Sequence, residues 1–128
     1  MRTSLVLALL TLPLALSGCG ALLGVGAGVV ISQDLMDNNT YVAQIAEDVD
    51  VAWATVKTSM GKQSDKPMHV DEDRRAVVAE IDNAEVTASV EAYDLNRCRL
   101  IVTARKYGVS NGEIAGLVFN RLLENFQQ

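Results

Sequence analysis

The chain has 128 residues, a formal net charge of −5 and a hydrophobic content of 49%. This length allows one domain with one modest core. An acidic chain without a basic stripe argues against nucleic acid as a partner. Only two cysteines are present, and no residues have metal-ligand spacing, so we expect neither a disulfide framework nor a metal or other cofactor.

The first eighteen residues have the three parts of a secretory signal peptide. One basic residue, Arg2, precedes an uncharged, leucine-rich run from Leu5 to Leu16, and small residues close it. A transmembrane helix is the alternative interpretation. However, the run is twelve residues long and contains Pro13, whereas a span needs about 20 apolar residues. We therefore predict that residues 1–18 are removed from the mature chain.

The leader ends in a lipobox, Leu16-Ser17-Gly18-Cys19. In this motif the cysteine thiol takes a diacylglyceryl group, and a peptidase accepts the small residues in its cleft and cuts before the cysteine. Two or three acyl chains on one residue form a permanent membrane anchor, because one chain alone binds only marginally. Gly20 is typical of lipoproteins sorted to the outer membrane. We expect Cys19 to anchor the chain there, facing the periplasm.

Residues 19–39 are predicted to be the lipidated N-terminus followed by a tether. Gly20 to Ile31 contains only glycine and aliphatic residues, and residues 32–39 are polar. A phosphate-binding loop would need a preceding strand and a following Lys-Ser/Thr, which the segment lacks. The folded domain is expected to span residues 40–128.

The domain is predicted to begin with a strand over Thr40–Ala46 and a helix after it. In the helix, apolar residues recur at helical spacing. Asp48 or Asp50 is expected to cap its start, and Gly61 to end it. The residues of the apolar stripe are Val49, Ala52, Trp53, Val56 and Met60.

A short strand at Met68–Asp71 and an acidic turn follow. Asp71, Glu72 and Asp73 could suggest a metal site, as could Glu47, Asp48 and Asp50 before them. Adjacent carboxylates point apart, and His69 is the only histidine, so we expect these acids to serve as turn and cap residues instead.

Two hairpins come next, and their apolar alternation gives their registers. In the first, opposing Ile81 to Val86 leaves Asn83-Ala84 as a two-residue loop. In the second, opposing Ala92 to Cys98 leaves residues 94–96 as a three-residue loop. This second register also places opposite charges across from each other, although charge was not used to choose it. The pairs are Glu91 with Arg99 and Glu85 with Arg105.

The chain closes with an amphipathic helix. Ser110 and Glu113 fit a capping box, and a wide apolar stripe runs from Ala115 to Phe126. Before this helix, the strand alternation turns Cys98 inward, where a free cysteine behaves as a small hydrophobe rather than as a nucleophile.

These elements predict an α+β fold. Tight turns between the strands favour a mostly antiparallel sheet in the order β-α-β-β-β-β-α. Small residues on one face of the sheet would let both helices pack there, which gives a two-layer sandwich with a polar outer face. The small residues are Ala79, Ala88, Ala92 and Ala104.

At this level the chain resembles the small bacterial lipoproteins grouped as domain of unknown function 3568. The matching parts are the lipobox, Tyr41, the segment Ala52-Trp53-Ala54-Thr55-Val56, and the stretch from Arg105 to Ile114. The resemblance covers nearly the whole mature chain. It implies a membrane-tethered domain of unassigned activity, and it supplies no catalytic residue.

Three functions are compatible with these features. The first is a non-enzymatic envelope lipoprotein that is held to the membrane through Cys19 and contacts another envelope protein. The second is a module that binds a small apolar or lipid-like ligand between the helices and the sheet, beside Trp53. An enzyme is the least favoured, because the sequence offers no Ser/His/Asp set, metal-ligand spacing or activated cysteine.

Overall fold

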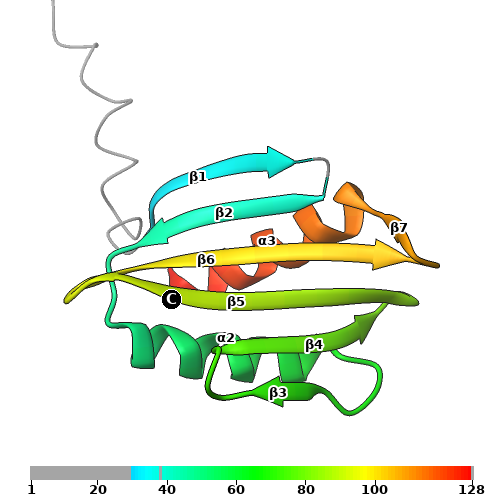
Figure 1. Cartoon of the computed structure of the whole chain (residues 1–128), viewed down its shortest axis with the longest axis horizontal. Coiled ribbons are helices and arrows are strands. Elements are labelled where there is room, and N and C mark those ends of the chain that lie inside the picture. Colours follow the sequence, from blue (N-terminus) through cyan, green and yellow to red (C-terminus); the bar gives the residue numbers. More distant parts are fainter. Residues whose placement is uncertain (1–29, 38, 128) are drawn as a thin grey trace, which may run out of the picture.

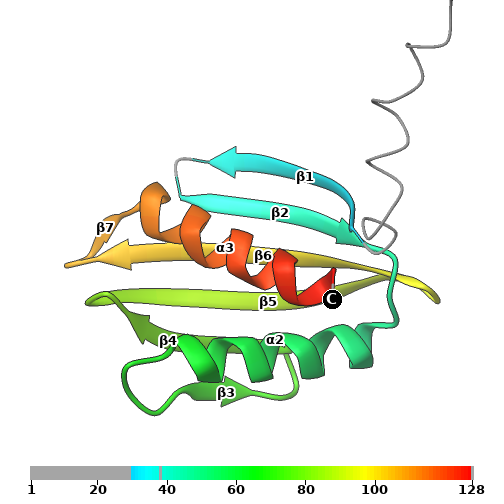
Figure 2. The same cartoon turned by 180° about the vertical axis from the view of Figure 1, so that it is seen from behind.

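The computed structural model describes residues 30–37 and 39–127. They form an antiparallel sheet with two helices on one face, which confirms the predicted α+β sandwich (Figures 1 and 2). The strand order is β1-β2-β6-β5-β4-β3, and β7 also pairs with β6. The elements are β1 (Val30–Asp37), β2 (Thr40–Ile45), α2 (Val49–Gln63), β3 (His69–Asp71), β4 (Ala76–Ile81), β5 (Ala84–Asp94), β6 (Arg97–Lys106), β7 (Val109–Ser110) and α3 (Gly112–Phe126).

The two longest strands, β5 and β6, lie at the centre of the sheet. Every residue pair predicted for this hairpin is present in its ladder, including both charge pairs. Glu91 lies opposite Arg99, with 3.8 Å between Glu91 Oε2 and Arg99 Nε. The apolar alternation was therefore sufficient to fix the register, because a slip of one residue would have turned the buried set to the solvent.

The register predicted for the first hairpin is wrong by two residues. Ile81 pairs with Ala84 rather than with Val86, so Asp82-Asn83 forms the two-residue loop. Both loop residues have positive φ, 52° and 63°, as a type I′ turn requires. Because the error is an even number of residues, the predicted inward set still faces the core.

The loop between β5 and β6 is also shorter than predicted. Asp94 pairs with Arg97 after a register shift in β5, so only Leu95 and Asn96 remain in the loop. The three-residue loop over 94–96 is wrong because the shift absorbs one residue that a regular ladder would have left unpaired.

Two strands were not predicted. β1 lies within residues 19–39, which were assigned to the lipidated N-terminus and tether, and it pairs with β2 along most of its length. Its polar residues gave no strand signal. β7 follows a turn at Tyr107-Gly108, where φ is 54° and 78°, and it pairs with the end of β6.

Helix α2 begins where predicted and ends later. The Asp48 side chain accepts hydrogen bonds from the backbone N–H groups of Asp50 and Val51, which caps the first turn. Gly61 does not end the helix, because the chain stays helical to Gln63 and the capping N–H of Ser64 donates to Met60 O. Glycine is common at the ends of helices, but its presence alone does not end a helix.

Helix α3 is capped by Asn111 rather than by the predicted Ser110–Glu113 box. The Asn111 side chain accepts a hydrogen bond from Ile114 N at 3.0 Å. Ser110 is held in β7 opposite Arg105, so it is unavailable as a cap. The backbone N–H of Asn111 donates to Ala104 O, and this bond fixes the start of α3 to the end of β6.

The core lies between the helices and the sheet, with β4, β5 and β6 supplying alternate residues. Ala79, Ala88 and Ala104 are buried as predicted, whereas Ala92 is exposed. The alternation in β5 stops after Val90, and all of its last four residues are exposed. The end of the β5–β6 hairpin therefore projects beyond the part of the sheet that the helices cover.

A close contact joins α3 to β2. The Tyr41 ring lies against Gly116, where an added Cβ would be 2.9 Å from Tyr41 Oη. The same ring stacks on Phe119, with 5.2 Å between ring centroids. Glycine at 116 therefore makes room for the aromatic pair, at the cost of about 1 kcal/mol in helix propensity relative to alanine.

Candidate functional site

The four lipobox residues, Leu16, Ser17, Gly18 and Cys19, lie outside the described residues. Their prediction therefore rests on the sequence. The described chain begins at Val30, which is the first residue of β1 and eleven positions after Cys19. The place of Val30 in the fold shows from which end of the domain the chain leads back to the predicted lipid.

Val30 lies at the end of the sheet that carries the β5–β6 turn. It pairs with Ile45, and Ile45 pairs with Cys98 on β6, which defines one row across three strands. β6 begins one residue before that row, and the turn at Leu95-Asn96 lies beyond it. Figure 1 shows the start of β1 and this turn at the same end of the molecule.

The β5–β6 turn presents two large apolar side chains to solvent. Leu95 is 88% exposed and Tyr93 is 52% exposed. The backbone N–H of Asn96 donates to Asp94 Oδ1, and Arg97 Nε donates to Asp94 Oδ2 at 2.7 Å. These bonds, that of Arg97 first, lower the pKa of the Asp94 carboxyl. The polar groups of the turn are thus paired within the hairpin, and the Leu95 side chain takes part in none of these bonds.

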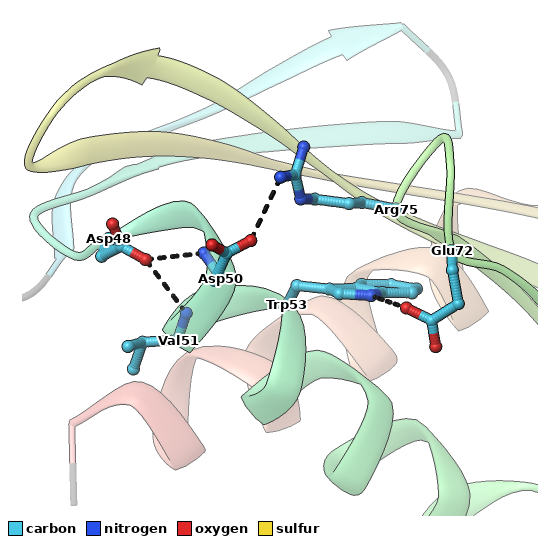
Figure 3. A network of polar contacts seen from close by, with 6 residues as sticks. All are labelled: Asp48, Asp50, Val51, Trp53, Glu72 and Arg75. Carbon is cyan, nitrogen blue, oxygen red and sulfur yellow. Dashed lines mark hydrogen bonds and ion pairs between the residues drawn. The ribbon is translucent and has the colours of Figure 1, made fainter.

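Trp53 is a buried residue with a polar partner. Its indole Nε1 donates to Glu72 Oε2 at 2.6 Å, and its side chain is 5% exposed (Figure 3). Lys57 Nζ donates to Glu72 Oε1 at 2.9 Å and lies 5.1 Å from the Trp53 ring centroid. The hydrogen bonds from Trp53 and Lys57 lower the pKa of the Glu72 carboxyl. Glu72 thus holds the turn after β3 against α2.

A second link ties the same turn to the start of α2. Arg75 Nη2 lies 3.1 Å from Asp50 Oδ1, while Asp48 caps the helix beside it (Figure 3). Arg75 has a positive φ of 49°, which few non-glycine residues adopt. Three of the predicted acidic residues, Asp48, Asp50 and Glu72, therefore act as a helix cap or as partners in ion pairs.

Among the described residues, no three His, Cys, Asp or Glu side chains are grouped as metal ligands. His69 is exposed on β3, and Glu72 is engaged by Trp53 and Lys57. None of the helices in the described ranges is long and apolar enough to cross a membrane.

Comparison of the chain with family models and with curated proteins found no match. The likeness to domain of unknown function 3568 therefore stays a prediction from its motifs. Two of these motifs have clear structural roles, since Tyr41 joins β2 to α3 and Trp53 anchors the turn after β3.

The described residues form two open cavities near the ends of the sheet and of α3, and Trp53 lines neither of these two. The larger, about 640 Å³, lies over the ends of β4, β5 and β6 and is lined by both charged and apolar residues, Lys66, Glu85, Arg105 and Tyr107 among them. The smaller, about 550 Å³, lies beside the start of α3 and includes Tyr41 and Leu117. An apolar ligand beside Trp53 has no cavity among these two.

Sequence reasoning missed the exposed pair at the β5–β6 turn, although a signal was present. Turns of this kind favour Gly, Asn, Asp and Ser, and Leu95 departs from that pattern between Asp94 and Asn96. By contrast, nothing in the sequence pairs Trp53 with Glu72, because the contact depends on how the turn after β3 folds back onto α2.

Cys98 is buried, as predicted, and burial raises the pKa of its thiol to about 11, with smaller contributions from Glu47 and Asp48. The thiol is therefore neutral at pH 8. It loses its proton only as the pH rises through about 11. We expect the mature native chain to show no thiol that reacts with Ellman's reagent at pH 8, and one after denaturation. One reactive thiol in the native chain would mean that Cys19 is not acylated or that Cys98 is accessible.

Proposed function

We propose that this protein is a lipoprotein of the bacterial envelope, anchored through acyl chains on Cys19 to the outer membrane and facing the periplasm. The observation that carries the proposal is the lipobox Leu16-Ser17-Gly18-Cys19 at the end of a short apolar leader. Acyl chains are the only attachment that this motif provides, and two or more of them hold a protein stably.

The domain that follows supports a role in contact rather than in catalysis. Two of the groups that catalysis could use have structural roles instead: the Cys98 thiol is buried, and Glu72 accepts hydrogen bonds from Trp53 and Lys57. We therefore propose a non-enzymatic, structural or protein-interaction role at the membrane. The alternative, a module for an apolar ligand beside Trp53, is less well supported, because Trp53 packs in the core and lines neither cavity.

The proposal is tested on the full chain expressed in a diderm bacterium. Mass spectrometry of the purified protein should show a chain that starts at Cys19 and carries the added mass of two or three acyl chains. Fractionation of the envelope should place the protein with the outer membrane, as Gly20 predicts. A chain that still begins at Met1, or a Cys19 without acyl groups, would refute the proposal.

A further inference from the structure

The end of the domain from which the chain leads back to Cys19 carries the most exposed leucine among the described residues. Leu95 is 88% exposed, and Tyr93 beside it is 52% exposed. Leu95 and Tyr93 are absent from the core, and the hydrogen bonds of the turn are made by Asp94, Asn96 and Arg97.

We propose that the tip of the β5–β6 hairpin is a second, non-covalent membrane contact, which inserts Leu95 and Tyr93 into the surface of the bilayer that holds the lipid anchor. The contact fixes which end of the domain faces the membrane. This inference rests on the proposed function, because it takes the anchor on Cys19 as given.

Three features of the tip suit a lipid interface. Leu95 supplies an apolar side chain at the turn itself, and Tyr93 supplies an aromatic ring with a polar end, the type that gathers at membrane–water interfaces. The ring is covered by a cation, with Arg97 Cζ 5.0 Å from its centroid. The charges of the hairpin are also paired internally, Asp94 with Arg97 and Glu91 with Arg99, which lowers the cost of bringing them near the hydrocarbon.

The position of the tip relative to the anchor argues for a membrane rather than another occupant. Ten residues, 20–29, separate Cys19 from Val30, and a chain of that length spans at most about 36 Å. β5 alone has eleven residues, which is about 37 Å at the usual rise of a strand. The tether joins the domain at the hairpin end, so this end is the first that the anchor can bring to the bilayer. The opposite end, with the Asp82-Asn83 and Tyr107-Gly108 turns, lies about one strand length further from the attachment point. The tether alone is long enough to let the domain turn, and contact of the tip with lipid is what would fix its orientation.

The surrounding charge makes the contact selective for a neutral surface. Glu47, Asp48 and Asp50 lie in the β2–α2 connection and the first turn of α2. They follow Ile45, which pairs with Cys98 beside the β5–β6 turn, so they lie at the same end of the domain as the tip. Carboxylates near an anionic headgroup layer are repelled within a Debye length, about 8–10 Å at physiological salt. A zwitterionic bilayer should therefore favour insertion over an anionic one.

The test places one fluorescent probe at the tip and one at the far end of the full mature chain. Leu95→Cys and Tyr107→Cys are the two sites, because both side chains are almost fully exposed, 88% and 85%. Cys98 is buried and Cys19 is acylated in the proposed protein, so an environment-sensitive maleimide dye labels only the new thiol. Each protein is reconstituted into phosphatidylcholine vesicles with brominated acyl chains.

Because an interfacially buried group lies about 5–10 Å below the surface, the bromines should quench roughly half of the emission at position 95 and almost none at position 107. Adding anionic phosphatidylglycerol should weaken the quenching at 95, and high salt should restore it. Equal quenching at both positions, or none at 95, would overturn the inference.

A second arm separates this inference from the proposed function. In it, Cys19 is replaced by serine, an oligohistidine tag replaces residues 1–18, and nickel-chelating lipids hold the chain to the vesicle. If the natural chain proves unacylated but position 95 is quenched from this artificial anchor, the proposed function fails and the hairpin contact stands. If the natural chain is acylated and position 95 is unquenched in both arms, only the hairpin contact fails.

Discussion

Replacing Cys19 with serine is expected to abolish both acylation and removal of the leader. In the proposed lipoprotein, the diacylglyceryl group attaches to the thiol, and the peptidase that cuts before position 19 acts on the lipidated cysteine. A hydroxyl in its place would therefore remove the substrate of both steps. The variant should keep residue 1 and carry no acyl mass. Intact-mass measurement of the protein from whole envelopes gives the answer directly. The unprocessed variant keeps the mass of the 18-residue leader and lacks the mass of the acyl chains, whereas the processed chain has lost the leader and gained the acyl chains.

The chain contains its own control, because Cys98 is the only other cysteine. Cys98→Ser should be processed and acylated like the natural chain, although a hydroxyl in place of a fully buried thiol costs some stability. Both variants lose one sulfur, so a difference between them isolates the position. Normal processing of the Cys19 variant, or loss of acylation in the Cys98 variant, would contradict the assignment of the lipobox.

The sheet shows which strand registers can be predicted from the sequence and which cannot. The β5–β6 register was predicted from apolar alternation alone, and Glu91 opposite Arg99 agreed with it. Alternation works there because one face is buried, so a slip of one residue would bury charges. β4 and β5 show the limit of this rule. A slip of two residues keeps every apolar side chain inward, and only the positive φ of Asp82 and Asn83 distinguishes the two registers.

The elements that escaped prediction have no apolar pattern of their own. β1 has Ser32, Gln33 and Asp34 in succession and pairs with a strand that is itself only six residues long. β7 has two residues. Such strands form because an adjacent strand offers unpaired backbone groups, which is a tertiary effect that local propensity does not record.

The candidate site divides in the same way. The proposed lipobox is a contiguous motif of the kind that enzymes recognise in an extended chain, so four adjacent residues are enough to predict its chemistry. The hairpin tip gains significance only when Leu95 and Val30 are known to share one end of the sheet. Val30 and Leu95 are brought to one end only because β1 pairs with β2 and β2 pairs with β6. This strand order was not predicted from the sequence.

Replacing Phe119 with alanine should destabilise the domain by about 3–5 kcal/mol, the usual range for a fully buried phenylalanine. Phe119 is 2% exposed and stacks on Tyr41, which in turn fills the space above Gly116. The substitution leaves a cavity in the core and removes the stacking partner that holds Tyr41 on α3. Against a typical total of about 5–15 kcal/mol for a folded protein, such a loss would bring the domain close to unfolding.

Urea unfolding of the detergent-solubilised full chain, followed by Trp53 fluorescence, measures the loss in the free energy of unfolding. In a separate thermal unfolding experiment, the midpoint should fall by at least about 12 °C. Leu117→Ala is the matched control, because Leu117 lies on the same helix and is 42% exposed. It should lose less than about 1 kcal/mol, in line with surface substitutions. Similar losses in both variants would mean that α3 is held by its whole surface rather than by the face that carries Phe119. In that case the close packing at Gly116 would not be the contact that fixes the closing helix to β2.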